Sequence, residues 1–318
     1  ELTGDNKLDV LVKTKLTPTG YMVELFIPYE TFYSVEGYQE QRPDDWWNAL
    51  VSATRQLLDM EVVRKEDIKA VAISGHSLGV VPIGKGGELL RERTPIWSDK
   101  RAVREADEFF NTIDYRTWYE ITGNGFPPAC YSLFKIAWYK RHEPDMYEKI
   151  DKVVGTKDYC NFCLTGRLCT DYSYASGSGA FSLSDWNYRE DFILSAGVSP
   201  HIFPEIIGSD EVVGVVTPQA SHATGLPVGT LVVCGGVDNS CMALGAKGIA
   251  DGRVYTSLGS SAWIALVSDK PILDFKYKPY VFAHVIKGMY ASATCIFSAG
   301  LSQKWVLNTF CQDLYEQE

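Results

Sequence analysis

The chain lacks any long apolar run. No stretch approaches the roughly 18 consecutive apolar residues that a membrane-spanning helix needs. The first residues, Glu1-Leu-Thr-Gly-Asp-Asn6, also lack the basic region and apolar block of a secretion signal. No segment is rich in lysine and arginine, and the formal net charge at pH 7 is −10. We therefore expect neither a nucleic acid nor a membrane as a partner.

Paired cysteines and metal-binding motifs are also missing. The eight cysteines lie at positions 130, 160, 163, 169, 234, 241, 295 and 311. Because they form no compact disulfide framework, they favour a reducing compartment, the cytoplasm. Cys160-Asn-Phe-Cys163, with Cys169 nearby, has no fourth ligand for zinc, and it lies inside an expected helix rather than at the helix start that a redox pair prefers. We predict buried cysteines here and no metal site.

The remaining composition is typical of a globular α/β protein. Of the 318 residues, 46% are apolar and 22% are charged, and this length predicts about two domains. Apolar periodicity and turn residues predict the elements that follow. Helices are expected at 44–60, 132–141, 145–150, 157–164 and 301–314, and strands or hairpins at 8–16, 20–28, 70–74, 80–90, 281–285 and 289–294.

The most informative segment is Leu231-Val-Val-Cys-Gly-Gly-Val-Asp-Asn239. Residues 231–234 predict a buried strand that the two glycines break, and residues 240–246 predict a helix. Asp238 would then lie at the carboxyl end of a strand, beside a helix amino terminus, where open α/β sheets bind ligands. A single carboxylate in this place suits a general base acting on a substrate hydroxyl. The alternative is that Asp238 only caps the helix.

A second segment, residues 252–267, is predicted to form two strands around a turn made of Gly259, Ser260 and Ser261. Small hydroxyl residues beside a glycine offer backbone N–H groups and hydroxyls to a phosphate. An ordinary hairpin turn has the same composition, so the residue types alone leave both interpretations open.

Several motifs, linked in order across most of the chain, resemble the FGGY carbohydrate kinases, and most closely their xylulokinase-like branch. These motifs are 40–47 (EQRPDDWW), 73–79 (ISGHSLG), 96–101 (IWSDKR), 155–159 (GTKDY), 164–166 (LTG), 170–177 (TDYSYASG), 235–239 (GGVDN) and 257–261 (SLGSS). The resemblance implies an α/β, actin/hexokinase-like fold with ribonuclease H-like lobes, the first nearly complete and the second truncated. It also implies a sugar-binding domain at 33–250 and the start of a nucleotide-binding domain at 251–318, while the strand pattern of residues 1–32 indicates an atypical β-rich segment.

The same resemblance implies a set of site residues. Asp238 would accept the proton of a sugar hydroxyl, while ATP, with its Mg²⁺, would place phosphates on Gly259, Ser260 and Ser261. Sugar contacts are implied for His76, Ser77, Leu78, Trp97, Asp99, Arg101 and Asn239. The loop 75–79 departs from the Gln-Met-His pattern of xylulokinases, which leaves the sugar open beyond a small pentulose such as xylulose. A plainer interpretation of Asp99 and Arg101 is a surface ion pair.

Two family features are absent from this sequence. Residues 1–32 contain no Asp-x-Gly-Thr hairpin of the kind that holds ATP phosphates in such kinases, and the adenine-binding segment is missing. Two functions are therefore expected: a sugar kinase, or a catalytically silent form that binds sugar but not nucleotide. An incomplete second domain is also expected to leave a sheet edge and apolar faces uncovered, and so to promote self-association, in its simplest form a homodimer.

Overall fold

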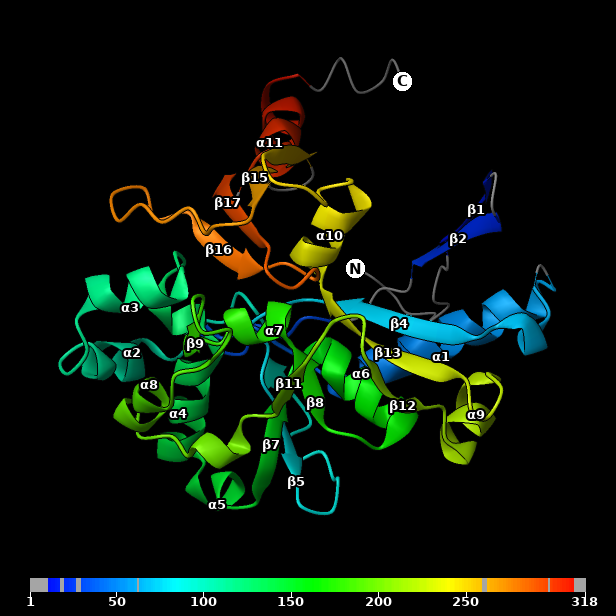
Figure 1. Cartoon of the computed structure of the whole chain (residues 1–318), viewed down its shortest axis with the longest axis horizontal. Helices are drawn as coiled ribbons and strands as arrows, with labels where there is room; N and C mark the ends of the chain where they lie inside the picture. The colour runs from blue at the N-terminus through cyan, green and yellow to red at the C-terminus, as the bar shows by residue number, and fades with distance from the viewer. Residues whose placement is uncertain are drawn as a thin grey trace.

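The computed structural model describes residues 11–17, 20–26, 30–61, 63–258, 262–296 and 298–311, with side chains from residue 30 onward except that of Leu301. A larger body, which contains most of the helices, and a smaller body built on a second sheet meet around one helix, α10 (Asp238–Gly245) (Figure 1). Near the N-terminus, β1 (Leu11–Thr17) and β2 (Gly20–Phe26) pair antiparallel and confirm the predicted hairpin strands.

The central layer of the larger body is a three-stranded sheet in the order β12-β13-β4. β13 runs parallel to β4 and antiparallel to β12. Helices pack against it through apolar side chains, among them Leu164, Ala220 and Val232. The helices predicted at 44–60 and 157–164 are confirmed to within one residue. The bounds in this layer are β4 (Ala70–Gly75), β12 (Val212–Val215), β13 (Leu231–Val237), α1 (Pro43–Asp59), α6 (Thr156–Thr165) and α9 (Pro218–Thr224).

β13 corrects the prediction for Gly235 and Gly236. The glycines do not end the strand, which continues to Val237 and is buried only at alternate positions over its first half. They instead shift its register on β4 between Val233 and Gly236. Gly235 has a φ of +70°, and a Cβ there would lie 2.1 Å from the carbonyl oxygen of Ile73. The bulge therefore requires glycine, because a side chain would push β13 away from β4.

An aromatic core fills the helical part of the larger body. Phe109, Trp118 and Phe134 are fully buried there, with Phe134 in edge-to-face contact with Phe109 and in tilted contact with Trp118. Aromatic side chains of this size supply much of the apolar area that such a core buries. The helices in this part are α2 (Val103–Phe109), α3 (Tyr115–Thr122), α4 (Ser132–His142), α5 (Pro144–Tyr147), α8 (Glu190–Ser195) and the 3₁₀ turns Pro128–Cys130 and Pro200–Ile202. A further 3₁₀ turn, Lys65–Asp67, lies between α1 and β4.

One helix prediction in this part is wrong. The helix expected at 145–150 is only the single turn α5, and Ile150 begins the strand β7 (Ile150–Val154). The strand forms because its apolar side chains are buried when it pairs antiparallel with β5 (Val81–Gly84). The short elements that complete this body are β3 (Glu40–Gln41), β6 (Thr94–Pro95), β8 (Cys169–Asp171), α7 (Tyr172–Ser176), β9 (Phe181–Ser182), β10 (Asn187–Tyr188) and β11 (Glu205–Ile207).

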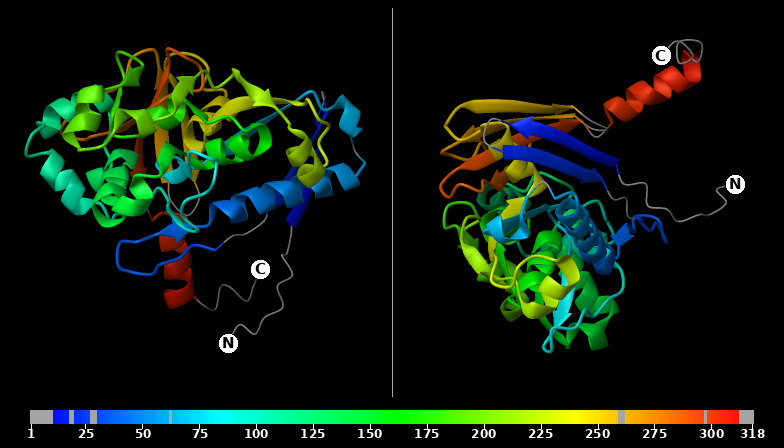
Figure 2. Two further views of the ribbon diagram at one scale, coloured as in Figure 1. Left: turned by 90° about the horizontal axis from the view of Figure 1, so that it is seen from below. Right: turned by 90° about the vertical axis from the view of Figure 1, so that its right-hand side faces the viewer.

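The smaller body is an antiparallel sheet in the order β14-β15-β17-β16. One face contributes to a pocket, and on the opposite face Val254, Leu258, Ile264 and Ile296 are each more than half exposed. This is the kind of open apolar face that we expected, while self-association itself stays a prediction. The strands are β14 (Arg253–Leu258), β15 (Ala262–Ser268), β16 (Tyr280–Ala283) and β17 (Tyr290–Ile296), followed by α11 (Gly300–Phe310), which points away from both bodies (Figure 2).

The environment of the cysteines was also predicted from the sequence, as buried at Cys160 and Cys163. All eight cysteines are free, and Cys160 is buried in α6 while Cys163 is half-buried. Within the described ranges, no cluster of histidine, cysteine and carboxylate side chains could hold a metal ion. None of the described helices is long and apolar enough to cross a membrane. The expected domain boundary near residues 250 and 251 stays a prediction.

Candidate active site

A pocket of about 200 Å³ lies where the two bodies meet. It brings together six of the eight residues predicted for catalysis and sugar binding, although they are up to 163 positions apart in the sequence. These six are His76, Ser77, Leu78, Trp97, Asp238 and Asn239. A more voluminous hollow of about 590 Å³ lies beside Arg91 and Glu143, but it contains none of the predicted residues. There the Arg91 guanidinium is already paired with Glu40 and Glu143.

Asp238 occupies the junction between β13 and α10. It is the first residue of the helix, whose cap position is Val237, so the interpretation as a helix-capping side chain is wrong. Its Oδ1 accepts the backbone N–H of the adjacent Asn239 at 2.8 Å. Surrounding protein atoms raise the pKa of this carboxyl, even though part of the residue remains open to solvent in the pocket. A carboxylate with a raised pKa is a stronger proton acceptor than one in water.

The loop after β4, the strand that pairs with β13, lines the pocket beside Asp238. His76 places Nε2 2.7 Å from the Thr156 hydroxyl and meets the Trp46 ring edge-to-face at 5.4 Å between centroids. Burial lowers the pKa of His76 to about 4, and the Lys135 ammonium adds to this effect, so the ring is neutral at pH 7. Its Nδ1 also lies 3.2 Å from the Ser77 carbonyl oxygen, so both ring nitrogens have protein partners, and a sugar hydroxyl would have to replace or share one of them.

Asp99 and Arg101 do not line the pocket, and their predicted contact with the sugar stays a prediction. Their charged ends form a buried network in which Arg101 binds both carboxylate oxygens of Asp99, at 2.8 and 2.9 Å, and Glu40 at 2.8 Å. Asp99 also accepts the backbone N–H of Gln39, and its exposed fraction is 0%. The network is not the surface pair of the plainer interpretation either, because both side chains are fully buried. It holds the segment that carries Trp97, which is 40% exposed.

The predicted phosphate turn, Gly259, Ser260 and Ser261, lies outside the described residues. The strands around it are described and pair as predicted, with Leu258 opposite Ala262 at the turn. Ser257, two residues before the turn, lines the pocket. The phosphate-binding role of the turn stays a prediction.

Six further residues line the pocket that sequence reasoning did not assign to it. They are Phe126, Met242, Ser257, Trp263, Phe282 and Cys295. Most are apolar and lie within strands or helices, where the sequence indicates only a core position. The alternation of side chains between the two faces of β14 and β15 could have identified two of them. Ser257 and Trp263 are cross-strand partners, so their side chains lie on the same face of the sheet.

Comparison with known proteins gives consistent matches. The profile of the "FGGY family of carbohydrate kinases, N-terminal domain" matches residues 25–245. A xylulose kinase of Bacillus subtilis is 30% identical over 294 residues, covering 91% of this chain and 58% of the relative. One of Staphylococcus xylosus is 27% identical, covering 99% of this chain and 66% of the relative. The chain thus spans roughly three fifths of the length of these relatives.

Solved structures agree with the sequence matches. A xylulose kinase from Rhodospirillum rubrum superimposes with a TM-score of 0.84 at 25% identity, covering 97% of this chain and 62% of that one. Plasmodium falciparum glycerol kinase with ADP gives 0.79 at 17% identity, covering 94% and 63%, which shows the shared fold. The expected actin/hexokinase-like α/β fold is confirmed by these neighbours. From the profile match over most of its length, the chain belongs to the FGGY family of carbohydrate kinases.

Proposed function

We propose that this chain is part of a kinase that transfers the γ-phosphoryl group of ATP to a hydroxyl of a small sugar, a pentulose such as xylulose. The observation that carries the proposal is the position of Asp238. Among the described residues that line the pocket, it is the one carboxylate, and His76, Ser77 and Asn239 share the pocket with it. The matched relatives named xylulose kinase support the choice of sugar.

In this proposal Asp238 accepts the proton of the attacking hydroxyl. Phosphoryl transfer depends mainly on positioning and on neutralising charge. A well-placed base and a defined position for the attacking hydroxyl supply the positioning of the acceptor. His76 and Asn239 hold neighbouring hydroxyls by hydrogen bonds. Trp97, Trp263 and Phe282 supply apolar surface against which the C–H face of a sugar can pack.

The chain offers a candidate segment for the phosphates of ATP, whereas Mg²⁺ would depend on those phosphates for its binding. The phosphates would be held by the turn at 259–261, because Ser257 already lines the pocket just before it. The described residues offer no carboxylate cluster for a cation, so Mg²⁺ would bind through the phosphates. When bound, Mg²⁺ would neutralise charge on the transferring phosphoryl group. We also propose a reducing, cytoplasmic compartment, which the eight free cysteines support.

The test replaces Asp238 by Asn in a coupled assay of ATP-dependent phosphorylation of D-xylulose. Turnover is expected to fall by at least about 100-fold, because the general base is lost. Xylulose binding, measured by calorimetry, should change little. The control is Asp107→Asn, which changes an exposed carboxylate on α2 away from the pocket. Full turnover in Asp238→Asn would reject the assignment of the base.

The alternative is a catalytically silent form that binds sugar without nucleotide. The chain spans 58% of the length of the Bacillus subtilis relative, so nucleotide binding by this chain is tested directly. Calorimetry of the wild-type chain with ATP and Mg²⁺, and separately with xylulose, distinguishes the two. Binding of sugar without nucleotide favours the silent form, whereas binding of both favours the kinase.

A further inference from the structure

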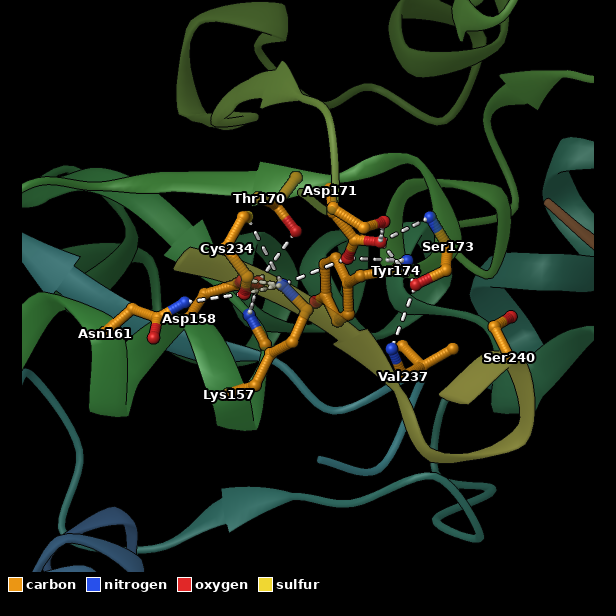
Figure 3. Close-up of polar contacts among 12 residues, drawn as sticks. Lys157, Asp158, Asn161, Thr170, Asp171, Ser173, Tyr174, Cys234, Val237 and Ser240 are labelled. Carbon is orange, nitrogen blue, oxygen red and sulfur yellow. Dashed lines mark hydrogen bonds and ion pairs between the residues drawn. The ribbon is translucent and has the colours of Figure 1, made fainter. Parts of the chain in front are cut away.

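Beneath the pocket, three buried charges lie close together. The Lys157 ammonium on α6 contacts Asp158 at 2.5 Å and Asp171 at 3.0 Å (Figure 3). All three side chains are at most 1% exposed. Burial raises the pKa of Asp158, while the two carboxylates hold the pKa of Lys157 well above its usual range. Charges this deep in a protein persist only when paired and hydrogen-bonded.

The second oxygen of Asp171 fixes the direction of the Ser173 hydroxyl. Asp171 Oδ2 accepts the Ser173 hydroxyl at 2.5 Å and the Ser209 hydroxyl at 2.7 Å. Because the Ser173 proton is committed to Asp171, the oxygen lone pairs face the opposite way, where they accept the backbone N–H of Val237 at 2.9 Å. Val237 directly precedes Asp238.

Side chains complete the hydrogen bonding of the last part of β13. β12 pairs with β13 only as far as Val233, and beyond it the Cys234 and Gly235 N–H groups donate to the backbone carbonyls of Glu211 and Ser209, each at 2.9 Å. The remaining groups are bound by side chains: Lys157 and Asn161 both donate to the Cys234 carbonyl, at 3.4 and 2.8 Å, and the Ser173 hydroxyl accepts the Val237 N–H. The buried charges thus act on the stretch of backbone that ends at the candidate base.

The short helix α7, which carries Ser173, also contacts the opposite wall of the pocket. The Ser176 hydroxyl on α7 accepts the backbone N–H of Ala283 at 3.0 Å, next to Phe282, which lines the pocket. Two serines of α7 therefore bind backbone on both sides of the site. Ser173 binds the backbone of β13, and Ser176 binds the backbone of β16. An element with this placement can set the distance between the two walls.

We propose that Lys157, Asp171 and Ser173 form a buried relay that positions the Asp238 carboxylate, with Ser173 as the positioning residue that binds the backbone N–H of the preceding residue, Val237. The inference rests on the proposed function, in which Asp238 is the base. Positioning of this kind matters because displacing a reacting group by about 1 Å can cost roughly 100-fold in rate.

The relay needs a carboxylate at position 171. Oδ1 faces the Lys157 ammonium and the Tyr174 N–H, and Oδ2 faces the Ser173 N–H together with two hydroxyls. Every partner is a donor, so either orientation of an Asn amide would turn an NH₂ group against donors. Asp171→Asn should therefore weaken the relay although the side chain keeps its shape.

The experiment follows the titration of the Asp238 carboxyl by carbon-detected NMR in the full chain. Asp238→Asn identifies the signal. Ser173→Ala removes the hydrogen bond that holds the backbone at Val237, next to Asp238. The Asp238 carboxylate should then become more hydrated, so its pKa should move down toward the ordinary range. Asp171→Asn should act in the same direction. The matched control is Thr224→Val in α9, since the buried Thr224 hydroxyl also accepts one backbone N–H and donates one hydrogen bond, in its case to a backbone carbonyl rather than a carboxylate.

Kinetics give the second readout. Ser173→Ala should lower kcat by roughly 10- to 100-fold with little change in the sugar KM, as expected when a reacting group is misplaced. If Ser173→Ala does not fold, the Asp238 carboxyl is titrated in Ser173→Cys instead. The Cys thiol is close to the Ser hydroxyl in size but accepts hydrogen bonds only weakly.

An Asp238 titration in the Ser173 variant that superimposes on the wild type overturns the inference, as does an equal shift in Thr224→Val. The proposed function fails separately, when Asp238→Asn retains wild-type turnover. In that case the relay still governs the titration of Asp238, so the two failures are distinguishable.

Discussion

The two walls of the pocket are held in place by opposite means. The wall with Asp238 rests on buried ion pairs and hydroxyls, with Lys157 and Asp171 almost fully enclosed. The wall with Trp263 and Phe282 is one face of a sheet held by regular strand pairing, and the other face of that sheet is exposed at Leu258 and elsewhere. The reacting group and the aromatic wall thus depend on different interactions.

The difference between the walls indicates which of them determines stability and which determines ligand affinity. Buried polar networks fix a geometry but tolerate few changes, because an unpaired buried group is costly. A sheet with one open face keeps its pocket side through backbone pairing, so single substitutions on it should be mild. We therefore expect stability to respond most in the first wall and ligand affinity to respond in the second.

The largest expected effect is on the buried charges. Lys157→Met leaves Asp158 and Asp171 without their cation, and breaking such a pair typically costs about 3–5 kcal/mol of unfolding free energy. Urea unfolding measures this loss. The control is Arg116→Met, which breaks an exposed pair with Glu120 and should cost at most about 1 kcal/mol. Similar losses in both variants would remove the contrast between buried and exposed charge.

The aromatic wall should show the reverse pattern. Trp263→Ala removes pocket surface and is expected to weaken xylulose binding about tenfold, or about 1.4 kcal/mol, while changing the unfolding free energy less than Lys157→Met does. Calorimetry measures the affinity. Trp305→Ala, on the exposed side of α11, serves as the control and should leave affinity unchanged. An unchanged affinity in Trp263→Ala would show that this wall does not touch the sugar.

A pH series tests the first wall at His76. Its folded pKa of about 4 lies below the unfolded value of about 6.5, so between these pH values the unfolded chain binds more protons. The stability from a neutral His76 is complete above pH 6.5 and is lost as the pH falls toward 4. We expect a loss on the order of 1 kcal/mol between pH 7 and pH 4.5, and a smaller one in His76→Gln. Parallel curves for the two proteins would contradict this.

The smallest effect on stability is expected on the open face of the second sheet. Ile264→Lys should change the unfolding free energy by no more than about 0.5 kcal/mol, since Ile264 is 54% exposed. It should nevertheless reduce self-association in sedimentation velocity, because apolar patches promote contact between copies. Val103→Lys, at an exposed position on α2, is the matched control. A wild-type chain that sediments as a monomer would exclude a role for this face.

Local patterns predicted much of the site. Glycines, a following carboxylate and an apolar run located Asp238, and the loop 76–78 followed from its place in the family order. The family match assigned Asp99 and Arg101 to the sugar, but it did not reveal that Arg101 also pairs with Glu40, about sixty positions away. Trp263 and Phe282 were missed for a related reason: an apolar residue in a strand looks the same whether it faces a core or a pocket.

The fold was predictable where the local sequence determines the secondary structure. The α6 helix and its end at Gly166 followed from periodicity and a left-handed glycine. The wrong helix at 145–150 and the unbroken β13 share a cause, which is pairing with a distant strand. Ile150 pairs with Gly84, and the bulged end of β13 pairs with β4. Neither partner is visible from the local sequence.

The bulge at Gly235 limits how the site can evolve. Any side chain there would meet the Ile73 carbonyl, and the backbone already has a positive φ. Position 235 therefore offers no neutral first step toward a new turn geometry around Asp238. By contrast, His76 and Trp97 project from loops that can vary one residue at a time. A descendant of this chain that prefers another sugar would retain the glycine and change the loops.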